Sequence, residues 1–298
     1  MHRSGAGLSV VVCTHNRPRD LERCLEALAR LDDEPEVIVV DSASRPSCED
    51  LVGRYAGLVS NLRYVREEAP GLSRARNTGV AHATRGIVAF VDDDAAPRQD
   101  WSRRVVAPFD DPSIGCVGGA CAAAFEDGAV RPRWLSDRLL QFAGITRFGP
   151  DAREARSSAE WPFGANIAFR AEILRGTQPF PEELGRCGTT LLSGEEYAVI
   201  EAVRKEGWKI WLEPNAIVDH AVHEKRCRSR YYWRRLWWAG VTRSRAVNSP
   251  VNVGLRLLGA LPIRLTLYAL TRDRIYLYRS AETAGFLVDR SRLRRGAR

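Results

Sequence analysis

The 298-residue chain contains 45 Lys and Arg against 37 Asp and Glu, a formal net charge of +8, and it is 45% hydrophobic and 28% charged. This globular composition excludes an intrinsically disordered or collagen-like chain. The charge is unevenly placed, because residues 224–298 have a net charge of +14 and residues 1–223 a net charge of −6. The seven scattered cysteines form no CxxC pair, which favours reduced thiols in a cytoplasmic protein.

The first hundred residues alternate short Val- and Ile-rich runs with helical patterns. The runs predict strands over Leu8–Cys13, Val37–Val40, Leu62–Val65 and Ile87–Val91. The helical patterns cover Pro18–Leu31, Cys48–Val59 and Arg74–Thr84. Apolar runs without polar alternation indicate strands that are covered on both faces. The sequence therefore predicts an α/β fold with a mostly parallel central sheet and right-handed crossovers.

The later part of the chain has fewer clear patterns. They predict a strand over Cys116–Phe125, a helix from Ser193 as N-cap to Glu206, two short strands between Trp208 and Asp219, and helices over Arg228–Arg245 and Leu255–Leu270. The longest apolar stretch, Pro250–Leu270, is interrupted by Arg256 and Arg264. We therefore expect no membrane-spanning helix, although a helix lying on a membrane surface stays open.

Polar residues follow three of the predicted strands. They are Thr14-His15-Asn16-Arg17, Asp41-Ser42 and Asp92-Asp93-Asp94. Any one of these could be a helix cap or turn former, but ligands of parallel sheets bind beyond the carboxyl ends of the strands, where all three meet. Adjacent carboxylates repel one another, and Mg²⁺ or Mn²⁺ would relieve that repulsion. The turn after the first strand has no glycine, which argues against a Rossmann dinucleotide site.

Two further features can carry chemistry. Glu195 and Glu196 open a predicted helix, where carboxylates favourably face the helix dipole, but a paired carboxylate can also act as a general base. His220 directly follows a predicted strand, which makes it a candidate metal ligand.

Taken in order, these segments resemble family 2 glycosyltransferases of the GT-A fold. The similarity rests on LSVVVCTHNRP, VIVVDSAS, GLSRARNTG, IVAFVDDDAAP, FGANIAFR, LLSGEEYAV and VDHAVHEKR, which together span about residues 8 to 230. The resemblance implies a Rossmann-like α/β/α sandwich for residues 1–223, with a nucleotide-sugar-binding half of about 1–98 and an acceptor-binding half of about 99–223. A basic helical region, 224–298, would follow. The QxxRW signature of processive synthases is absent, so transfer of a single sugar is expected.

The resemblance also implies roles for individual residues. The nucleotide-sugar site would comprise Thr14, His15, Asn16, Arg17, Asp41, Arg76, Asp92 and Asp93, with Asp41 reading the uracil edge. The divalent metal would be held by Asp94, Asp92 and His220. Glu196 would be the catalytic base of an inverting reaction, with Glu195 beside it. The acceptor would contact Trp161, Phe163, Gly164, Asn166 and Glu195.

The expected partners are a nucleoside diphosphate sugar, either a UDP- or a dTDP-sugar, and an acceptor hydroxyl on a saccharide, a lipid-linked glycan or a natural product. A nucleotidyltransferase and a non-catalytic nucleotide-sugar-binding or membrane-docking protein are the alternatives. For the basic, tryptophan-containing C-terminal region we expect packing on the core first and peripheral contact with the inner face of the membrane second. A homodimer through its helices is a further alternative. Nucleic-acid binding is not expected, because no nucleic-acid-binding motif accompanies the basic residues.

Overall fold

The protein is described by a computed structural model that covers residues 7–126, 128–146, 148–157, 160–175, 179–246 and 250–296. The chain divides into two compact units. Unit 1 comprises Met1–Ala124, Gly144–Gly185 and Glu195–Ala221, and unit 2 comprises Phe125–Ala143, Arg186–Gly194 and Val222–Arg298. The sequence predicts a domain boundary after residue 223. Unit 2 also includes two segments that precede this position, and the predicted boundary stays a prediction.

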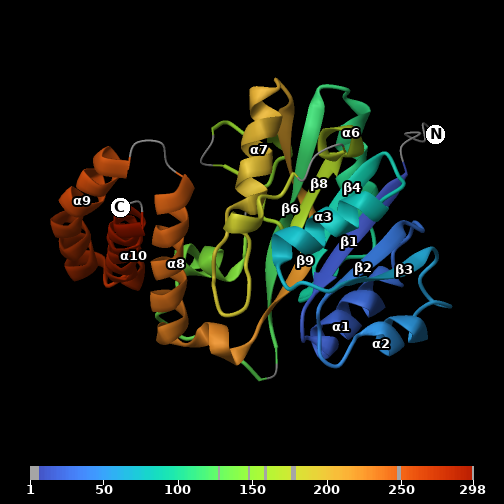
Figure 1. The fold of residues 1–298 in the computed structure, drawn as a ribbon, viewed down its shortest axis with the longest axis horizontal. Helices are drawn as coiled ribbons and strands as arrows, with labels where there is room; N and C mark the ends of the chain where they lie inside the picture. Colours follow the sequence, from blue (N-terminus) through green and yellow to red (C-terminus); the bar gives the residue numbers. More distant parts are fainter. Residues whose placement is uncertain are drawn as a thin grey trace. The chain divides into compact units, whose positions relative to one another are not determined.

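A single mixed sheet organises unit 1 (Figure 1). Its strands are β1 (Leu8–Thr14), β2 (Glu36–Ser42), β3 (Leu62–Glu67), β4 (Ile87–Asp92), β5 (Ala95–Pro97), β6 (Ile114–Phe125), β7 (Arg153–Glu154), β8 (Asn166–Arg170) and β9 (Lys209–Val222). The order is β3-β2-β1-β4-β8-β6-β9-β5, and β7 pairs with β9. Strands β1 to β4 are parallel as predicted, whereas β8 runs antiparallel to both β4 and β6.

Both faces of β1, β2 and β4 are buried, which explains their apolar runs, whereas β3 is partly exposed and has a mixed sequence. Val10 and Val12 of β1 belong to one buried cluster, together with residues of α1 (Pro18–Leu28) and α2 (Glu49–Arg54). Val11 points into a second cluster, with residues of α3 (Leu72–His82), α6 (Ala171–Leu174) and α7 (Glu195–Lys205). Successive side chains of a strand point to opposite faces, so one apolar run supplies both cores. The α/β fold is therefore as predicted. The remaining helix of this unit is α4 (Trp101–Val106), and short 3₁₀ helices cover Ala107–Asp110 and Glu182–Leu184.

Several predicted elements differ from the structure in their extent. The helix predicted over Cys48–Val59 ends at Arg54, where Gly53 and Gly57 weaken the helical propensity of the segment. The two short strands predicted after Trp208 form one continuous strand, β9. Pro214 lies between the part of β9 that pairs with β7 and the part that pairs with β5, where a residue without an N–H group is tolerated. Helix α7 begins at Glu195, so Ser193 is not its N-cap residue.

Unit 2 is helical. It contains α5 (Asp137–Leu140), α8 (Ser229–Ala246), α9 (Pro250–Thr271), α10 (Arg274–Gly296) and 3₁₀ helices at Gln141–Ala143 and Glu224–Cys227. Figure 1 shows α10 between α8 and α9. Gly240 of α8 and Gly285 of α10 permit a close approach, because a Cβ atom at either position would clash with the backbone of the other helix. Tyr232 and Tyr278 stack between the same two helices with a centroid separation of 6.1 Å.

Helix α9 contains an apolar segment that is mostly outside the core. Within the described residues, Asn252–Thr271 is the one helical segment that is long and apolar enough to cross a membrane by length and composition. Its mean hydropathy is 1.4, and 11% of the segment is buried. The sequence predicts no spanning helix in this stretch because of Arg256 and Arg264, whereas the structure contains a helix here that is long and apolar enough.

Candidate active site

The carboxyl ends of three parallel strands bring the predicted polar residues to one edge of the sheet. In the register of the sheet, Cys13 lies opposite Asp92 and Thr14 lies opposite Asp41. The residues that follow β1, β2 and β4 are therefore neighbours in space, as expected for a ligand site on a parallel sheet.

The three adjacent aspartates have different partners. Asp93 is buried and accepts hydrogen bonds from the Thr14 hydroxyl at 2.9 Å and from Arg17 Nη1 at 3.0 Å. Asp94 is also buried and lies 3.4 Å from Arg17 Nη1, whereas the side chain of Asp92 is 32% exposed. Burial and the neighbouring Asp94 and Asp92 carboxylates raise the pKa of Asp93 to about 7, although Arg17 opposes this rise. Arg17 thus partly neutralises a crowded acidic cluster.

Asp92, Asp94 and His220 form a group that can hold a metal ion. One ligand atom from each residue lies within 4.8 Å of the others. His220 Nε2 is 3.3 Å from Asp94 Oδ1, and strand pairing places His220 opposite Ala95 of β5. Gly144 has φ +91°, and a Cβ atom there would lie 2.9 Å from the imidazole ring. Two carboxylates and an imidazole form a donor set that suits a divalent cation, so these residues fit the metal that the sequence predicts.

A buried arginine connects the aspartates to the paired glutamates. Arg76 Nη1 donates to Glu195 Oε1 at 2.8 Å, and Nη2 lies 3.5 Å from Asp92 Oδ1. Glu196 Oε2 is 4.0 Å from Arg76 Nη1. Burial alone would lower the pKa of Arg76, but the Glu195 and Asp92 carboxylates raise it, so the guanidinium stays charged.

The environment of Arg76 also explains a nearby glycine. The guanidinium carbon lies 5.8 Å from the centre of the Phe90 ring and 5.6 Å from that of Phe180. A Cβ atom at Gly164 would collide with the guanidinium. Gly164, predicted to contact the acceptor, therefore makes room for Arg76.

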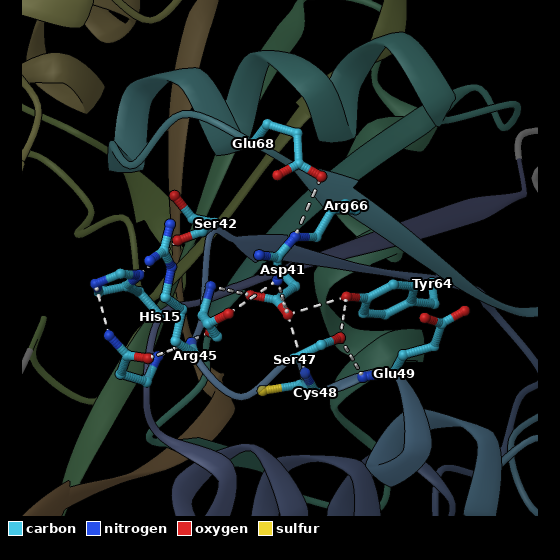
Figure 2. A network of polar contacts seen from close by, with 12 residues as sticks. His15, Asp41, Ser42, Arg45, Ser47, Cys48, Glu49, Tyr64, Arg66 and Glu68 are labelled. Atoms are coloured by element: carbon cyan, nitrogen blue, oxygen red, sulfur yellow. Dashed lines mark hydrogen bonds and ion pairs between the residues drawn. The ribbon is translucent and has the colours of Figure 1, made fainter.

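Asp41 is the centre of a separate polar network (Figure 2). Its carboxylate accepts hydrogen bonds from the backbone N–H groups of Ser44 and Cys48, from the Tyr64 hydroxyl and from Arg66 Nη1, at 2.8 to 3.0 Å. Burial alone would raise the pKa of Asp41, but these hydrogen bonds lower it overall. The carboxylate is fully buried and holds the loop after β2, so its geometry does not favour the predicted contact with the uracil edge, which stays a prediction.

The loop after β1 is attached to the same network. His15 Nδ1 is 2.5 Å from the Ser42 carbonyl oxygen, and the Asn16 backbone N–H donates to Ser44 Oγ. Asn16 also accepts a hydrogen bond from the Arg45 backbone N–H at 2.8 Å and adopts a φ of 54°. Asparagine tolerates that left-handed conformation better than most residues do. His15 and Asn16 are exposed, so they remain accessible to a nucleotide.

Sequence reasoning did not identify Tyr64 and Arg66 as residues of this network. They lie two positions apart on β3, and residues so spaced share one face of a strand. Polar side chains at alternate positions near the end of a predicted strand were the available signal.

The predicted acceptor residues have two kinds of environment. Trp161 and Phe163 are partly exposed, and Trp161 packs edge-to-face on Tyr197 with a centroid distance of 5.4 Å. Asn166 is fully buried, accepts a hydrogen bond from Trp101 Nε1 and donates to the carbonyl oxygens of Ala120 and Ala216. Both N–H groups of its amide are used within the protein, so the geometry does not favour the predicted contact with an acceptor, which stays a prediction.

The family model for glycosyl transferase family 2 matches residues 9–174, which include the strand ends and the aspartates described above. The chain belongs to glycosyl transferase family 2. This membership favours glycosyltransferase activity over the nucleotidyltransferase and non-catalytic alternatives. The chain spans 57% of the length of the first curated relative described below.

Curated relatives of this family 2 enzyme are also glycosyltransferases. The chain is 25% identical to glycosyltransferase AglE of Haloferax volcanii over 59% of this chain and 57% of that protein. It is 24% identical to a glucosyl-dolichyl phosphate glucuronosyltransferase of the same organism, over 79% of this chain and 76% of that protein. It is 27% identical to a pre-mycofactocin glycosyltransferase of Mycobacterium tuberculosis, over 82% of this chain but only 48% of that protein.

Solved structures share the fold. A mannosyltransferase from Pyrobaculum calidifontis, solved with GDP-Man and Mn²⁺, has a TM-score of 0.63 at 22% identity, with 95% of this chain and 88% of that chain covered. S. aureus TarS in complex with UDP-GlcNAc has a TM-score of 0.57 at 16% identity, with 97% and 92% covered. At these identities the likeness concerns the fold, which is of the GT-A type as the sequence motifs implied.

Proposed function

We propose that this family 2 enzyme transfers one sugar from a nucleoside diphosphate sugar to an acceptor hydroxyl with inversion at the anomeric carbon. The proposal rests on one arrangement, in which a metal-binding group (Asp92, Asp94 and His220) and a glutamate pair (Glu195 and Glu196) are connected through Arg76. A diphosphate leaving group needs positive charge, which a bound metal supplies, and the acceptor hydroxyl needs a base, which a glutamate supplies.

The donor is a UDP- or dTDP-sugar in this proposal. The exposed His15 and Asn16 offer polar groups to the base and ribose, and the loop held by Asp41 forms the adjoining wall. Support for a nucleotide-sugar donor also comes from the solved relatives that carry UDP-GlcNAc or GDP-Man.

Asp92, Asp94 and His220 would hold a Mg²⁺ or Mn²⁺ ion. A bound divalent cation supplies positive charge for the diphosphate as it departs. Arg76 lies next to Asp92 and orients Glu195, so its charge also contributes to the electrostatics of this site.

Glu196 is the proposed catalytic base. It accepts the proton of the acceptor hydroxyl while the hydroxyl oxygen forms a bond to the anomeric carbon. The bond from that carbon to the diphosphate oxygen breaks, and the diphosphate leaves with the electron pair. Attack on the face opposite the leaving group inverts the configuration. Glu195 is already engaged by Arg76 through a 2.8 Å ion pair, which leaves the proton transfer to Glu196 in this proposal.

The acceptor would lie against the partly exposed Trp161 and Phe163, whose rings suit the apolar face of a sugar or another ring system. A lipid-linked acceptor is one candidate class, because one relative is named as acting on a glucosyl-dolichyl phosphate.

The test is a screen of nucleotide sugars for stabilisation of the protein and for donor hydrolysis, with Mn²⁺, with Mg²⁺ and with a chelator. We expect one donor class to be hydrolysed slowly in the presence of metal, with loss of hydrolysis in chelator and in Asp94→Asn. Asp100→Asn is the matched control, since Asp100 pairs with Arg104 on the protein surface. Undiminished turnover by Asp94→Asn in chelator would contradict the metal site, and failure to bind any nucleotide sugar would contradict the donor assignment.

A further inference from the structure

Helix α9 in unit 2 carries an exposed aliphatic surface. We call it the α9 apolar face and define it by Leu255, Leu258, Ile263, Leu265 and Leu270, whose exposed fractions run from 44% to 76%. Single exposed leucines are ordinary, but five large aliphatic side chains exposed along one helix make a broad apolar surface, which we also call the apolar strip. Such a strip is typical of a surface that contacts another apolar phase.

The opposite side of α9 packs against α10 of the same unit. Leu257 is buried, and Gly254 faces the rings and methyl groups of Phe286 and Leu287 on α10. Arg264 donates from Nη1 to the Arg279 carbonyl oxygen and to Thr283 Oγ1, both at 2.9 Å. Of the two arginines that interrupt the apolar sequence, Arg264 thus contacts α10, so Arg256 is the one charged residue among the exposed side chains of α9 between Leu255 and Leu270.

These contacts are difficult to reconcile with a membrane-spanning role for α9. A spanning helix would carry the packed α10 into the hydrocarbon, although α10 contains several arginines and the buried acidic residues Glu282 and Asp289. Pro262 also interrupts the hydrogen bonding of α9 near its middle. The geometry suits a helix that lies in the plane of a bilayer surface, with only one face inserted.

Charge distinguishes a bilayer from a second copy of the chain. Residues 224–298 have a net charge of +14, α9 itself contains no Asp or Glu, and the exposed Arg256 and Arg272 lie beside and just after the apolar strip. Two copies paired through this face would bring two strongly basic regions together. Anionic lipid headgroups would instead neutralise the arginines while the leucines enter the acyl boundary.

We propose that the α9 apolar face docks this enzyme on the surface of an anionic lipid bilayer. This inference does not depend on the proposed sugar transfer.

Vesicle co-sedimentation of the full chain tests it, with phosphatidylcholine alone and with phosphatidylcholine mixed with phosphatidylglycerol, at low and high salt. We expect binding to the anionic vesicles at low salt and little binding to the neutral ones. The double variant Leu258→Gln/Ile263→Gln should lower the partition coefficient by about tenfold or more, because both apolar insertions are lost while a good helix former is kept. Leu58→Gln is the matched control, since Leu58 is 65% exposed in unit 1.

A second variant addresses the charge. Arg256→Gln/Arg272→Gln should reduce the preference for anionic vesicles and weaken the salt dependence, whether or not the first variant folds well. Equal binding of both double variants and the wild type would overturn the proposal, as would equal binding to neutral and anionic vesicles. A dimer in light scattering that Leu258→Gln/Ile263→Gln converts to a monomer, without vesicle binding by the wild type, would assign the face to a second copy instead.

Discussion

Arg76 and Glu195 form a buried ion pair between segments that are 119 positions apart in the sequence, with 2.8 Å between Nη1 and Oε1. Their side chains are 4% and 2% exposed. Desolvation makes a buried pair costly to form, and removal of one partner leaves an uncompensated buried charge. The pair therefore makes the position of the glutamates depend on α3, the helix that also places Arg76 beside Asp92.

Replacement of Arg76 by leucine should destabilise the protein strongly. Glu195 would lose its buried counter-charge, so we expect the free energy of unfolding to fall by about 3 to 5 kcal/mol. Urea denaturation measures this change. Arg74→Leu is the matched control on the same helix, because Arg74 pairs with Glu182 at the surface and such a pair contributes at most about 1 kcal/mol. Similar losses for both variants would show that the buried pair has no special role.

Glu196→Gln should abolish transfer and leave donor binding nearly unchanged. An amide cannot accept the proton of the acceptor hydroxyl, and we expect kcat to fall by roughly 10²- to 10⁴-fold. Initial rates with the donor found in the screen, together with donor affinity by calorimetry, separate the two effects. Glu201→Gln, on the same helix and paired with Arg204, should turn over normally. Normal turnover by Glu196→Gln would mean that another group is the base.

Asn166→Ala should lower the stability of the protein more than it lowers the affinity for the acceptor. The change removes the amide that bonds Trp101, Ala120 and Ala216 and leaves these buried groups without that partner. We expect a loss of about 2 to 4 kcal/mol in the free energy of unfolding. In contrast, Trp161→Ala should raise the KM for the acceptor with a smaller effect on unfolding. If Asn166→Ala raised that KM at unchanged stability, Asn166 would contact the acceptor directly.

Glu36 should make part of the stability dependent on pH. Burial raises the pKa of Glu36, but hydrogen bonds from Ser9 and Thr84 outweigh it, so the pKa in the folded state is lowered. A lowered folded-state pKa means that the stabilisation is present above the unfolded-state pKa of about 4.3 and is lost as pH falls through the folded-state value.

Thermal unfolding of Glu36→Gln across pH measures this contribution. The variant should be less stable than the wild type near neutral pH, and the difference should shrink below about pH 4. Glu34→Gln, two positions away and exposed, should show no such trend. A difference that stays constant with pH would indicate that the Glu36 charge contributes nothing.

Much of the N-terminal, parallel part of the sheet was predictable because its signals are local. An uninterrupted run such as Val37–Val40 indicates a strand buried on both faces, and a polar residue directly after it falls at the binding edge of a parallel sheet. The position of Asp41 and the aspartates at that edge follows from these rules. The joint order of the motifs also sufficed to identify the family.

What each side chain contacts was not predictable in the same way. The predicted ligand contacts of Asp41 and Asn166 stay predictions, but the hydrogen bonds that both side chains make to other segments of the protein were not foreseen. Hydrogen-bond saturation depends on which segments meet, and spacing along the chain does not encode it. The same is true of Tyr64 and Arg66, whose importance appears only when β3 pairs with β2.

The net charge of +8 is also explained partly by the sequence and partly by the tertiary structure. The sequence alone places the excess of basic residues in 224–298 and shows an apolar stretch interrupted by arginines. Only the tertiary structure decides that Arg264 donates its hydrogen bonds to α10 while five aliphatic side chains of α9 stay exposed. The physical reason is that helix packing selects which face is covered, and a residue count cannot tell an arginine bound to a neighbouring helix from one that can reach a lipid phosphate.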